Sequence, residues 1–393
     1  MAATSNGVVV AGGCLDAEPG VGAYSCLSPS AVVDVVAADA STTRTTQLPG
    51  GARAWASACA VGDDAVVVAG GGTTAAKSAA ADLVRVASST EKNASSFITV
   101  SSNASALSQA RWGVACATAG STTYFAGGIG GPHSDYLGVV DACTYDASAS
   151  TLRCSVAPFE LSQVRESMGA VSAESGGTLV SFLGGWNELL DEPNSALVDS
   201  FDVSTGERSS SQLSGAAYWP GGARVAGVEY AVDNGALNAR DSSASSSEAW
   251  TTTALPAPLS GPEELRLAPY ESGGAIPSEH VPQNGVTIGD CLACFYGDAT
   301  TSPLDDEDDV GREAKDSKKN PRTEARSPAV HCFNARTAQW LEPLPCSARH
   351  KAGGIAAIGD TIFVAGGYDP DDPNNAPTDV VDVFANVAEG VCA

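Results

Sequence analysis

The chain has 393 residues and is short of several residue types, and each shortage limits what the protein can be. Its 21 basic residues face 46 acidic ones, and the formal charge of −25 argues against nucleic acid or an anionic membrane surface as partner. No apolar run reaches the ~18 residues of a membrane helix, so we expect no membrane insertion. The N-terminal "MAATSNGVVVAGG" has no basic n-region. We therefore expect a cytoplasmic protein, or a secreted one if the N-terminus is truncated.

Residues that carry redox and metal chemistry are also scarce or scattered. The chain has four histidines, none adjacent to another, and it has no Gly-x-Ser-x-Gly, HExxH or P-loop motif. Cys291 and Cys294 form a lone C-x-x-C, whose side chains point to opposite faces on a strand. We predict neither a metal nor a cofactor.

The eleven cysteines are spread along the chain and form no small disulfide framework. We expect most of them to be small buried hydrophobic residues in strands. Cys143 and Cys154 flank the turn "DASAS" and could form a cross-strand bridge.

What the chain does have is glycine, valine and alanine, in a recurring pattern. A run of strand formers ends in two glycines in "NGVVVAGG", "DDAVVVAGG", "STTYFAGG", "GTLVSFLGG" and "GDTIFVAGG". The first four pairs start at Gly12, Gly70, Gly127 and Gly184, at spacings of 58, 57 and 57 residues. A period in the fifties fits one four-stranded blade of a propeller. Glycine suits a strand end where a neighbouring backbone comes close and φ is positive.

The flanks of the diglycines repeat as well. An arginine precedes four of the pairs by 16 to 19 residues, and an apolar strand around an acid, such as "AVVDVV" or "GVVDAC", follows. A last strand ends in Trp and a "LP" turn, most clearly in "NARTAQWLEPLP". This ordered set resembles the kelch repeat over nearly the whole chain.

The resemblance implies an all-β fold, a single β-propeller over residues 1–393 built from four-stranded antiparallel blades. Two further units, Ala223–Ala236 and Asn284–Asp298, lack the diglycine and bring the count to seven blades, with six as the alternative. The arginine of the first unit would precede residue 1, so we expect its inner strand to be missing. Residues 299–328, an acidic block followed by a mixed basic block, are expected to be a disordered insertion in blade six.

The long loops and the entries into the inner strands should share one face of such a propeller. We predict that the side chains at these entries ring the mouth of a central funnel and bind a protein segment or a small acidic ligand. The alternative is that each arginine anchors a blade through nearby carbonyls or acids. The predicted site residues are Arg53, Arg111, Arg165, Tyr218, His280 and Arg349.

The function expected from this pattern is that of a kelch-repeat scaffold for protein–protein interaction, more plausibly a binding protein than an enzyme. Copper-radical oxidases of the galactose oxidase kind need paired histidines, which this chain lacks. The alternative is a carbohydrate-active enzyme similar to the sialic-acid epimerases, which share the fold and use Arg and acid/base side chains. Glu166 could serve it as a general base.

Overall fold

The protein is described by a computed structural model, and the described part of the chain is entirely β-structure, loops and turns. The described residues are 1–15, 26–73, 75–88, 97–102, 106–233, 236–242, 250–255, 285–297, 328–350, 353–367 and 378–392. Among them we find no helix, and hence none with the length and apolarity to cross a membrane. The all-β class and the four-stranded antiparallel sheets predicted from the sequence are confirmed.

The first four sheets each hold four strands that pair in antiparallel fashion. Sheet one consists of β1 (Ala2–Thr4), β2 (Gly7–Ala11), β3 (Val32–Ala37) and β4 (Thr43–Gln47). Sheet two consists of β5 (Ala54–Val61), β6 (Ala65–Gly72), β7 (Ala81–Val86) and β8 (Ile98–Ser102). Sheet three consists of β10 (Ala115–Ala119), β11 (Thr122–Ala126), β14 (Val139–Asp146) and β15 (Thr151–Glu160). Sheet four consists of β16 (Gly169–Val171), β17 (Leu179–Leu183), β18 (Leu197–Asp202) and β19 (Glu207–Gln212).

The remaining sheets follow the same chain order. Sheet five consists of β20 (Gly221–Val225), β21 (Val228–Val232), β22 (Ala236–Asp241) and β23 (Thr251–Ala254). Sheet six consists of β24 (Gly285–Ile288), β25 (Leu292–Gly297), β26 (Ala329–Asn334), β27 (Gln339–Trp340) and β28 (Leu344–Pro345). Sheet seven consists of β29 (Gly354–Ile358), β30 (Thr361–Ala365) and β31 (Val381–Phe384). A small extra sheet joins β9 (Arg111–Trp112), β12 (Ile129–Gly130) and β13 (Asp135–Tyr136).

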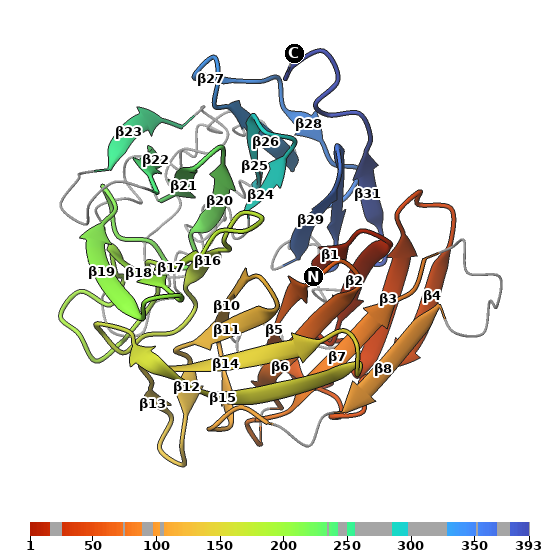
Figure 1. Ribbon diagram of the computed structural model, residues 1–393, viewed down its shortest axis with the longest axis vertical. Helices are drawn as coiled ribbons and strands as arrows, with labels where there is room; N and C mark the ends of the chain where they lie inside the picture. The colour runs from red at the N-terminus through yellow and green to blue at the C-terminus, as the bar shows by residue number, and fades with distance from the viewer. Residues whose placement is uncertain are drawn as a thin grey trace, which may run out of the picture.

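The seven sheets follow one another around a common centre, from the red sheet one through yellow and green to the blue sheet seven (Figure 1). The first strand of each sheet is the innermost, and it contacts the first strand of the next sheet. Hydrophobic clusters fill the space between successive sheets because each sheet is apolar on the faces it turns to its neighbours.

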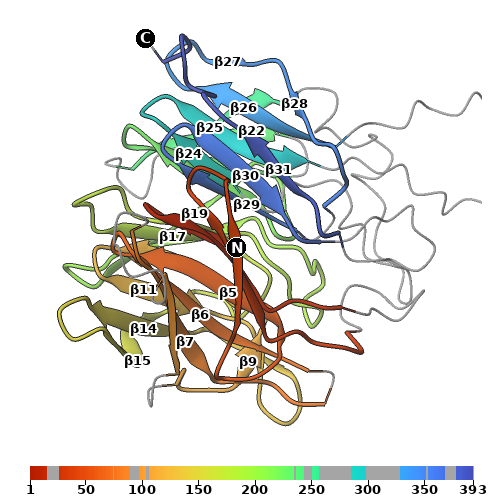
Figure 2. The ribbon, with the colours of Figure 1, turned by 90° about the vertical axis from the view of Figure 1, so that its right-hand side faces the viewer.

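The ring of contacts closes between sheet seven and sheet one. β1 and β2 both contact β29, and Val8 and Val36 of sheet one pack on Ala356 and Phe363 of sheet seven. Both views show the first and last sheets side by side (Figures 1 and 2). The expectation that the first unit lacks an inner strand is wrong. Residues 2–4 form that strand, although they include no arginine.

The first four diglycines join sheets one to four to the sheet that follows each through one backbone carbonyl group, whereas a Cβ on Gly366 would meet only a side-chain carbon of Val10 at 3.9 Å. A Cβ on Gly12 would lie 2.7 Å from the carbonyl oxygen of Arg53, and one on Gly70 would lie 2.9 Å from that of Arg111. Gly127 and Gly184 meet the carbonyl oxygens of Arg165 and Ala217 in the same way. Only glycine leaves room for this approach, and all four have positive φ, where glycine carries no steric penalty.

The second glycine adds a hydrogen bond to the same carbonyl group. The backbone N–H of Gly13 donates to Arg53 O at 3.1 Å, that of Gly128 to Arg165 O at 3.0 Å, and that of Gly185 to Ala217 O at 2.9 Å. We call the residue that supplies this carbonyl the entry residue, since the chain there enters the first strand of its sheet. The entry residues of sheets two to five are Arg53, Arg111, Arg165 and Ala217.

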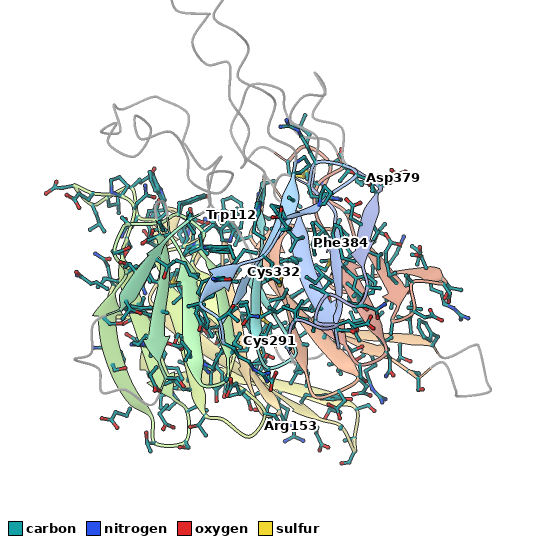
Figure 3. All side chains as sticks on the ribbon, turned by 90° about the horizontal axis from the view of Figure 1, so that it is seen from above. Trp112, Arg153, Cys291, Cys332, Asp379 and Phe384 are labelled. Atoms are coloured by element: carbon teal, nitrogen blue, oxygen red, sulfur yellow. A yellow bond between two sulfur atoms is a disulfide. The ribbon has the colours of Figure 1, made fainter. Side chains whose placement is uncertain are left out.

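The two ends of the sheets differ in character. One end carries the turns between first and second strands, and the other carries the entry residues and the loops that follow the diglycines. We call the second end the long-loop face. Trp112 and Asp379 lie toward this face, whereas Arg153 and Cys291 lie toward the opposite one (Figure 3).

Ten of the eleven cysteines form disulfides, so the expectation that most are simple buried hydrophobic residues is wrong. The predicted Cys143–Cys154 bridge across β14 and β15 is confirmed. Cys59–Cys116 joins the first strands of sheets two and three. The other three pairs are Cys14–Cys26, Cys291–Cys392 and Cys294–Cys332.

The disulfide between two sheets should contribute more stability than the one within a hairpin. Cys59–Cys116 spans 57 residues and Cys143–Cys154 spans 11, so loop-closure entropy gives about 4 and about 3 kcal/mol respectively. We expect C59A/C116A to lower the free energy of unfolding in guanidinium chloride more than C143A/C154A does. Equal losses in the two variants would mean that Cys59–Cys116 constrains the unfolded chain no more than Cys143–Cys154 does.

Candidate functional site

The three predicted arginines of sheets two, three and four are buried at the long-loop face. The exposed fractions of Arg53, Arg111 and Arg165 are 1%, 0% and 0%. Each guanidinium group faces an aspartate on the third strand of its own sheet, at 2.6 Å for Asp82, 2.7 Å for Asp141 and 2.9 Å for Asp199. These side chains are ion-paired inside the protein.

Each of these pairs is embedded in further hydrogen bonds. Arg111 donates to the carbonyl oxygens of Gln109 and Phe125, and Asp141 accepts from the backbone N–H and hydroxyl of Ser108. In sheet four, Ser162 donates to Asp199 in the same way. A Ser-x-x-Arg sequence and the Asp of the following apolar strand thus form one structural unit.

The burial of these arginines contradicts the prediction that they form an open cationic ring. A guanidinium group with no exposed surface and a carboxylate partner cannot reach a ligand without breaking a buried ion pair. The alternative expectation, that each arginine anchors its blade through carbonyls and acids, describes Arg53, Arg111 and Arg165 as the structure places them.

Sheet five places a different residue at the entry position than predicted. Ala217, not Tyr218, supplies the carbonyl to the preceding diglycine. The aspartate position of this sheet is Asn238, whose amide oxygen accepts from the N–H of Ser214 at 2.8 Å. Ala217 and Asn238 thus stand where sheets two to four have the arginine and its aspartate, and Asn238 Nδ2 donates to the buried carboxylate of Asp233 at 2.9 Å. Tyr218 itself is 5% exposed and packs against Trp186 and Trp219.

Sheet seven differs from the prediction by one residue too. His350, not Arg349, occupies the buried position, with Nε2 3.0 Å from an Asp382 oxygen and Nδ1 2.9 Å from Gly366 O. Ser347 donates to Asp382, as Ser108 does to Asp141. Both ring nitrogens thus lie within hydrogen-bond distance of an oxygen atom. Arg349 is half-buried beside it, and His280 lies outside the described residues.

Burial and the opposite charge of the ion-pair partner shift the pKa of each of these buried groups in opposite directions. Burial lowers the pKa of Arg111 and of Arg165, and the facing aspartate opposes that effect. Burial alone would raise the pKa of Asp199, but the Arg165 charge and hydrogen bonds from Ser162 and Ser210 outweigh it and hold this pKa below its usual range. Glu229 is similar, because Arg224 and Arg240 pair with it on both sides and lower its pKa despite burial.

Aromatic side chains form the other prominent group at the long-loop face. The rings of Trp55 and Trp112 meet edge to face at 5.3 Å between centroids, and Ile129 separates Trp112 from Tyr136 in the small sheet. Tyr136 packs with a second set of rings that belongs to sheets four and five. We call the whole group the aromatic arc. It consists of Trp55, Trp112, Tyr136, Trp186, Tyr218 and Trp219.

The arc is held by backbone in a left-handed conformation. The residue two positions after each entry residue has positive φ: 55° for Trp55, 64° for Gly113, 50° for Ser167 and 57° for Trp219. Glycine adopts this conformation freely, whereas a bulky residue there costs about 1–3 kcal/mol. Trp55 and Trp219 are nevertheless half-buried tryptophans at two of the four positions.

Polar groups accompany the rings. The carboxylate of Glu166, 1% exposed, accepts from the Ser167 hydroxyl at 3.1 Å, and its backbone pairs with Trp186. Lys77 Nζ lies 5.2 Å from the centre of the Trp112 ring and donates to Gly130 O, Gly131 O and Ser134 Oγ. Burial, with smaller effects of the nearby Glu188 and Glu166, raises the pKa of Tyr136 to about 12.

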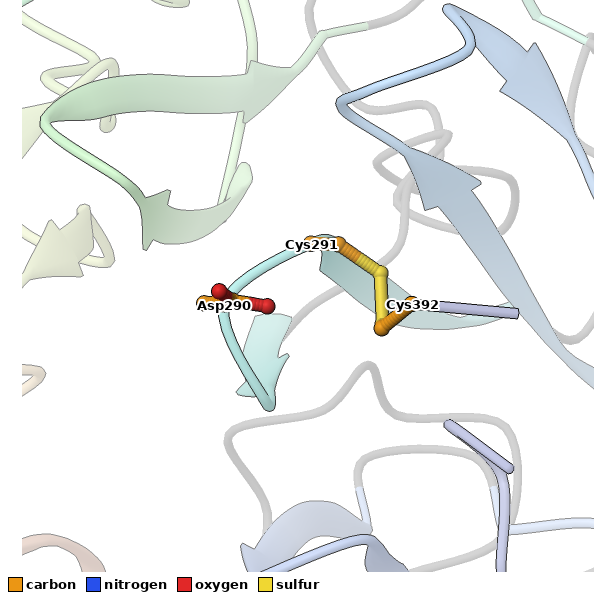
Figure 4. A group of neighbouring side chains, drawn as sticks. All are labelled: Asp290, Cys291 and Cys392. Atoms are coloured by element: carbon orange, nitrogen blue, oxygen red, sulfur yellow. A yellow bond between two sulfur atoms is a disulfide. The ribbon is translucent and has the colours of Figure 1, made fainter. Parts of the chain in front are cut away.

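A cysteine-containing cluster at the opposite face does not suit a metal ion. Asp290, Cys291 and Cys392 bring potential ligand atoms within 4.8 Å of one another. Cys291 and Cys392 are joined in a disulfide, so neither offers a thiolate (Figure 4). Cys294 of the C-x-x-C bonds separately to Cys332.

Sequence reasoning pointed to Trp55, Trp112, Trp186, Tyr218 and Trp219 as aromatic residues near the funnel mouth that could stack on a sugar or a peptide, with core packing as the alternative. It missed the aspartate partners of the arginines and the backbone position that Trp55 and Trp219 share. The acids in "VVDAC" and "LVDSF" repeat in step with the arginines. That shared period could have indicated that each acid pairs with an arginine. Trp55 and Trp219 stand two residues after their entry residues, but Gly113 and Ser167 hide that register.

Searches against protein-family models and against curated proteins each returned no match.

The uncharged residues Ala217 and Asn238 of sheet five suggest a test of whether Arg111 only anchors its sheet. Asp141→Asn leaves the Arg111 charge buried without an opposite charge and should lower the free energy of unfolding by about 3–5 kcal/mol. The double variant R111A/D141N copies Ala217 and Asn238 and should lose less than the single variant. Urea unfolding measures both, and a double variant that is less stable than the single one contradicts a purely anchoring ion pair.

Stability should fall in acid because Asp199 and Glu229 have pKa values below their usual range in the folded state. A carboxylate with a depressed folded pKa stabilises the fold above its unfolded pKa, near 4, and loses that contribution as the pH falls through its folded pKa. The urea midpoint should change little from pH 7 to 5 and drop below about pH 4. Asp199→Asn should make that drop shallower, and an unchanged slope would contradict the assignment.

Proposed function

We propose that the chain is a seven-bladed propeller of the kelch type that binds a partner through its long-loop face without catalysing a reaction. The blade count of seven rests on the seven sheets, among which the Ala223 unit forms a full sheet, β20–β23. The diglycine contacts and the packing of β1 on β29 support a ring that closes through its first and last sheets.

The observation that carries the binding role is the pair of tryptophans in left-handed backbone at the long-loop face. Trp55 and Trp219 stand where sheet three has Gly113, and the fold itself is better served by glycine there. Residues that strain the backbone and leave part of a large ring exposed are typical of functional surfaces. We therefore assign the binding surface to the aromatic arc in place of the arginines.

The buried arginines also bear on the kind of ligand and on catalysis. Recognition of an acidic ligand by Arg53, Arg111 and Arg165 would require these ion pairs to open, so an acidic ligand loses its main support. The epimerase-like alternative loses the same arginines. Glu166 remains, but its carboxylate accepts from Ser167 and has almost no exposed surface.

The five disulfides favour an oxidising compartment, since such bonds are rare in the reducing cytosol. We therefore propose secretion or export rather than the cytoplasmic location expected from the N-terminal sequence. Protein produced in an oxidising compartment should show a mass lower by two hydrogens per disulfide without reductant.

Trp55→Gly and Trp219→Gly separate binding from folding. Both substitutions relieve a left-handed tryptophan, which offsets the ring contacts that are lost, so the free energy of unfolding should change little, while retention of partners should fall about tenfold or more. Immobilised wild type and variants are compared by mass spectrometry of what they retain from the same extracellular extract of the source cells. Arg153→Ala, at the opposite face, is the matched control (Figure 3). Partners lost in R153A but kept in both glycine variants would contradict the proposal.

A further inference from the structure

We propose that the aromatic arc binds a neutral saccharide, an inference that rests on the binding role of the long-loop face. Trp55, Trp112 and Trp219 are half-buried, so each ring keeps part of its surface for a ligand. The C–H groups on one side of a sugar ring form an apolar surface that packs on an indole face, and its hydroxyls remain free for hydrogen bonds. Tryptophans at the entries of sheets two, three and five, together with the other rings of the arc, suit such a ligand.

Two polar atoms next to the rings have no hydrogen-bond partner among the residues that the structure describes. They are the indole Nε1 of Trp112, a donor, and the side-chain Oδ1 of Asn194, an acceptor. Asn194 pairs through its backbone with Trp186 of the arc. Both atoms are themselves buried, so a ligand hydroxyl reaches them only when the neighbouring rings shift. A buried polar atom without a partner is costly, and such a contact removes that cost. A hydroxyl both donates and accepts, so a saccharide can serve both atoms.

The backbone at the arc offers little to an extended peptide. The N–H of Ser167 donates to Gly113 O, and the N–H of Trp219 donates to Ser167 O. Glu166 and Trp186 exchange both of their backbone hydrogen bonds. Peptides that bind by strand addition need an unpaired row of backbone groups, and here these groups already pair with one another. Recognition must therefore come from side chains.

The charges around the arc favour a neutral ligand over an anionic one. The Lys77 ammonium group is held by three oxygen atoms, and Arg111 and Arg165 are paired with aspartates. The carboxylate of Glu166 lies in the same cluster and repels anions. Among the described residues, the cations that lie next to the rings are thus already engaged, and the arc presents ring faces and hydrogen-bonding atoms.

Calorimetric titration with defined oligosaccharides tests the proposal on the full-length, disulfide-bonded chain. The neutral probes are cellohexaose, laminarihexaose, mannohexaose and chitohexaose, and the anionic probe is hexagalacturonate. We expect at least one neutral probe to bind and to change tryptophan fluorescence. Trp55→Gly and Trp112→Phe should each weaken it at least tenfold, the latter because phenylalanine keeps a ring but loses the N–H.

Trp340→Phe is the matched control. Its Nε1 also lacks a partner, but the ring packs on Phe295 and Phe333 of sheet six, away from the arc. The proposal is overturned if only hexagalacturonate binds, if W340F weakens binding as much as W112F, or if no neutral probe binds. If no neutral probe binds but the retention of partners still depends on Trp219, the binding role of the long-loop face remains and only the saccharide proposal is overturned. If the retention of partners does not depend on Trp219 either, the binding role is overturned as well.

Discussion

The contact between a diglycine and the backbone carbonyl of the next sheet is the constraint on which the rest of the structure depends. At four junctions it brings two backbones closer than a side chain permits, and at three of them the N–H of the second glycine donates to the same carbonyl group. Because the carbonyl belongs to the entry residue, the same contact places the start of each first strand. The hydrophobic clusters between sheets then form at a distance already set at the long-loop face.

The entry arginine connects this contact to the rest of its own sheet. Its carbonyl group holds the preceding sheet, while its guanidinium group holds the third strand of its own sheet through an aspartate. In sheet five the carbonyl contact and the ion pair are separate, because Ala217 keeps the carbonyl contact and Asn238 stands in the aspartate position. The buried carboxylate of this sheet is Asp233, which accepts hydrogen bonds from Ser214, Gly215, Ala236 and Asn238.

The sequence predicts the all-β class and the repeated sheets because both depend on periodic features, namely apolar runs and glycine pairs. It places the candidate site less well because a shift of one residue reverses the direction of a side chain on a strand. The distance from arginine to diglycine varies by three residues, so counting selected Tyr218 where the entry residue is Ala217. In sheet seven the arginine of the pattern, Arg349, was selected where the residue that faces the aspartate is His350. Disulfides such as Cys59–Cys116 were missed because they join strands of different sheets, whose register a single sequence does not fix.

At the long-loop face, the same backbone position holds glycine in one sheet and tryptophan in two others. At the second residue after the entry, Gly113 satisfies the left-handed conformation at no steric cost, while Trp55 and Trp219 adopt it against their preference. The surrounding hydrogen bonds of Ser167 and Trp219 hold this conformation whatever the side chain is. A framework that dictates backbone geometry so strongly can therefore carry large rings at its mouth and fix their direction, which a flexible loop would not.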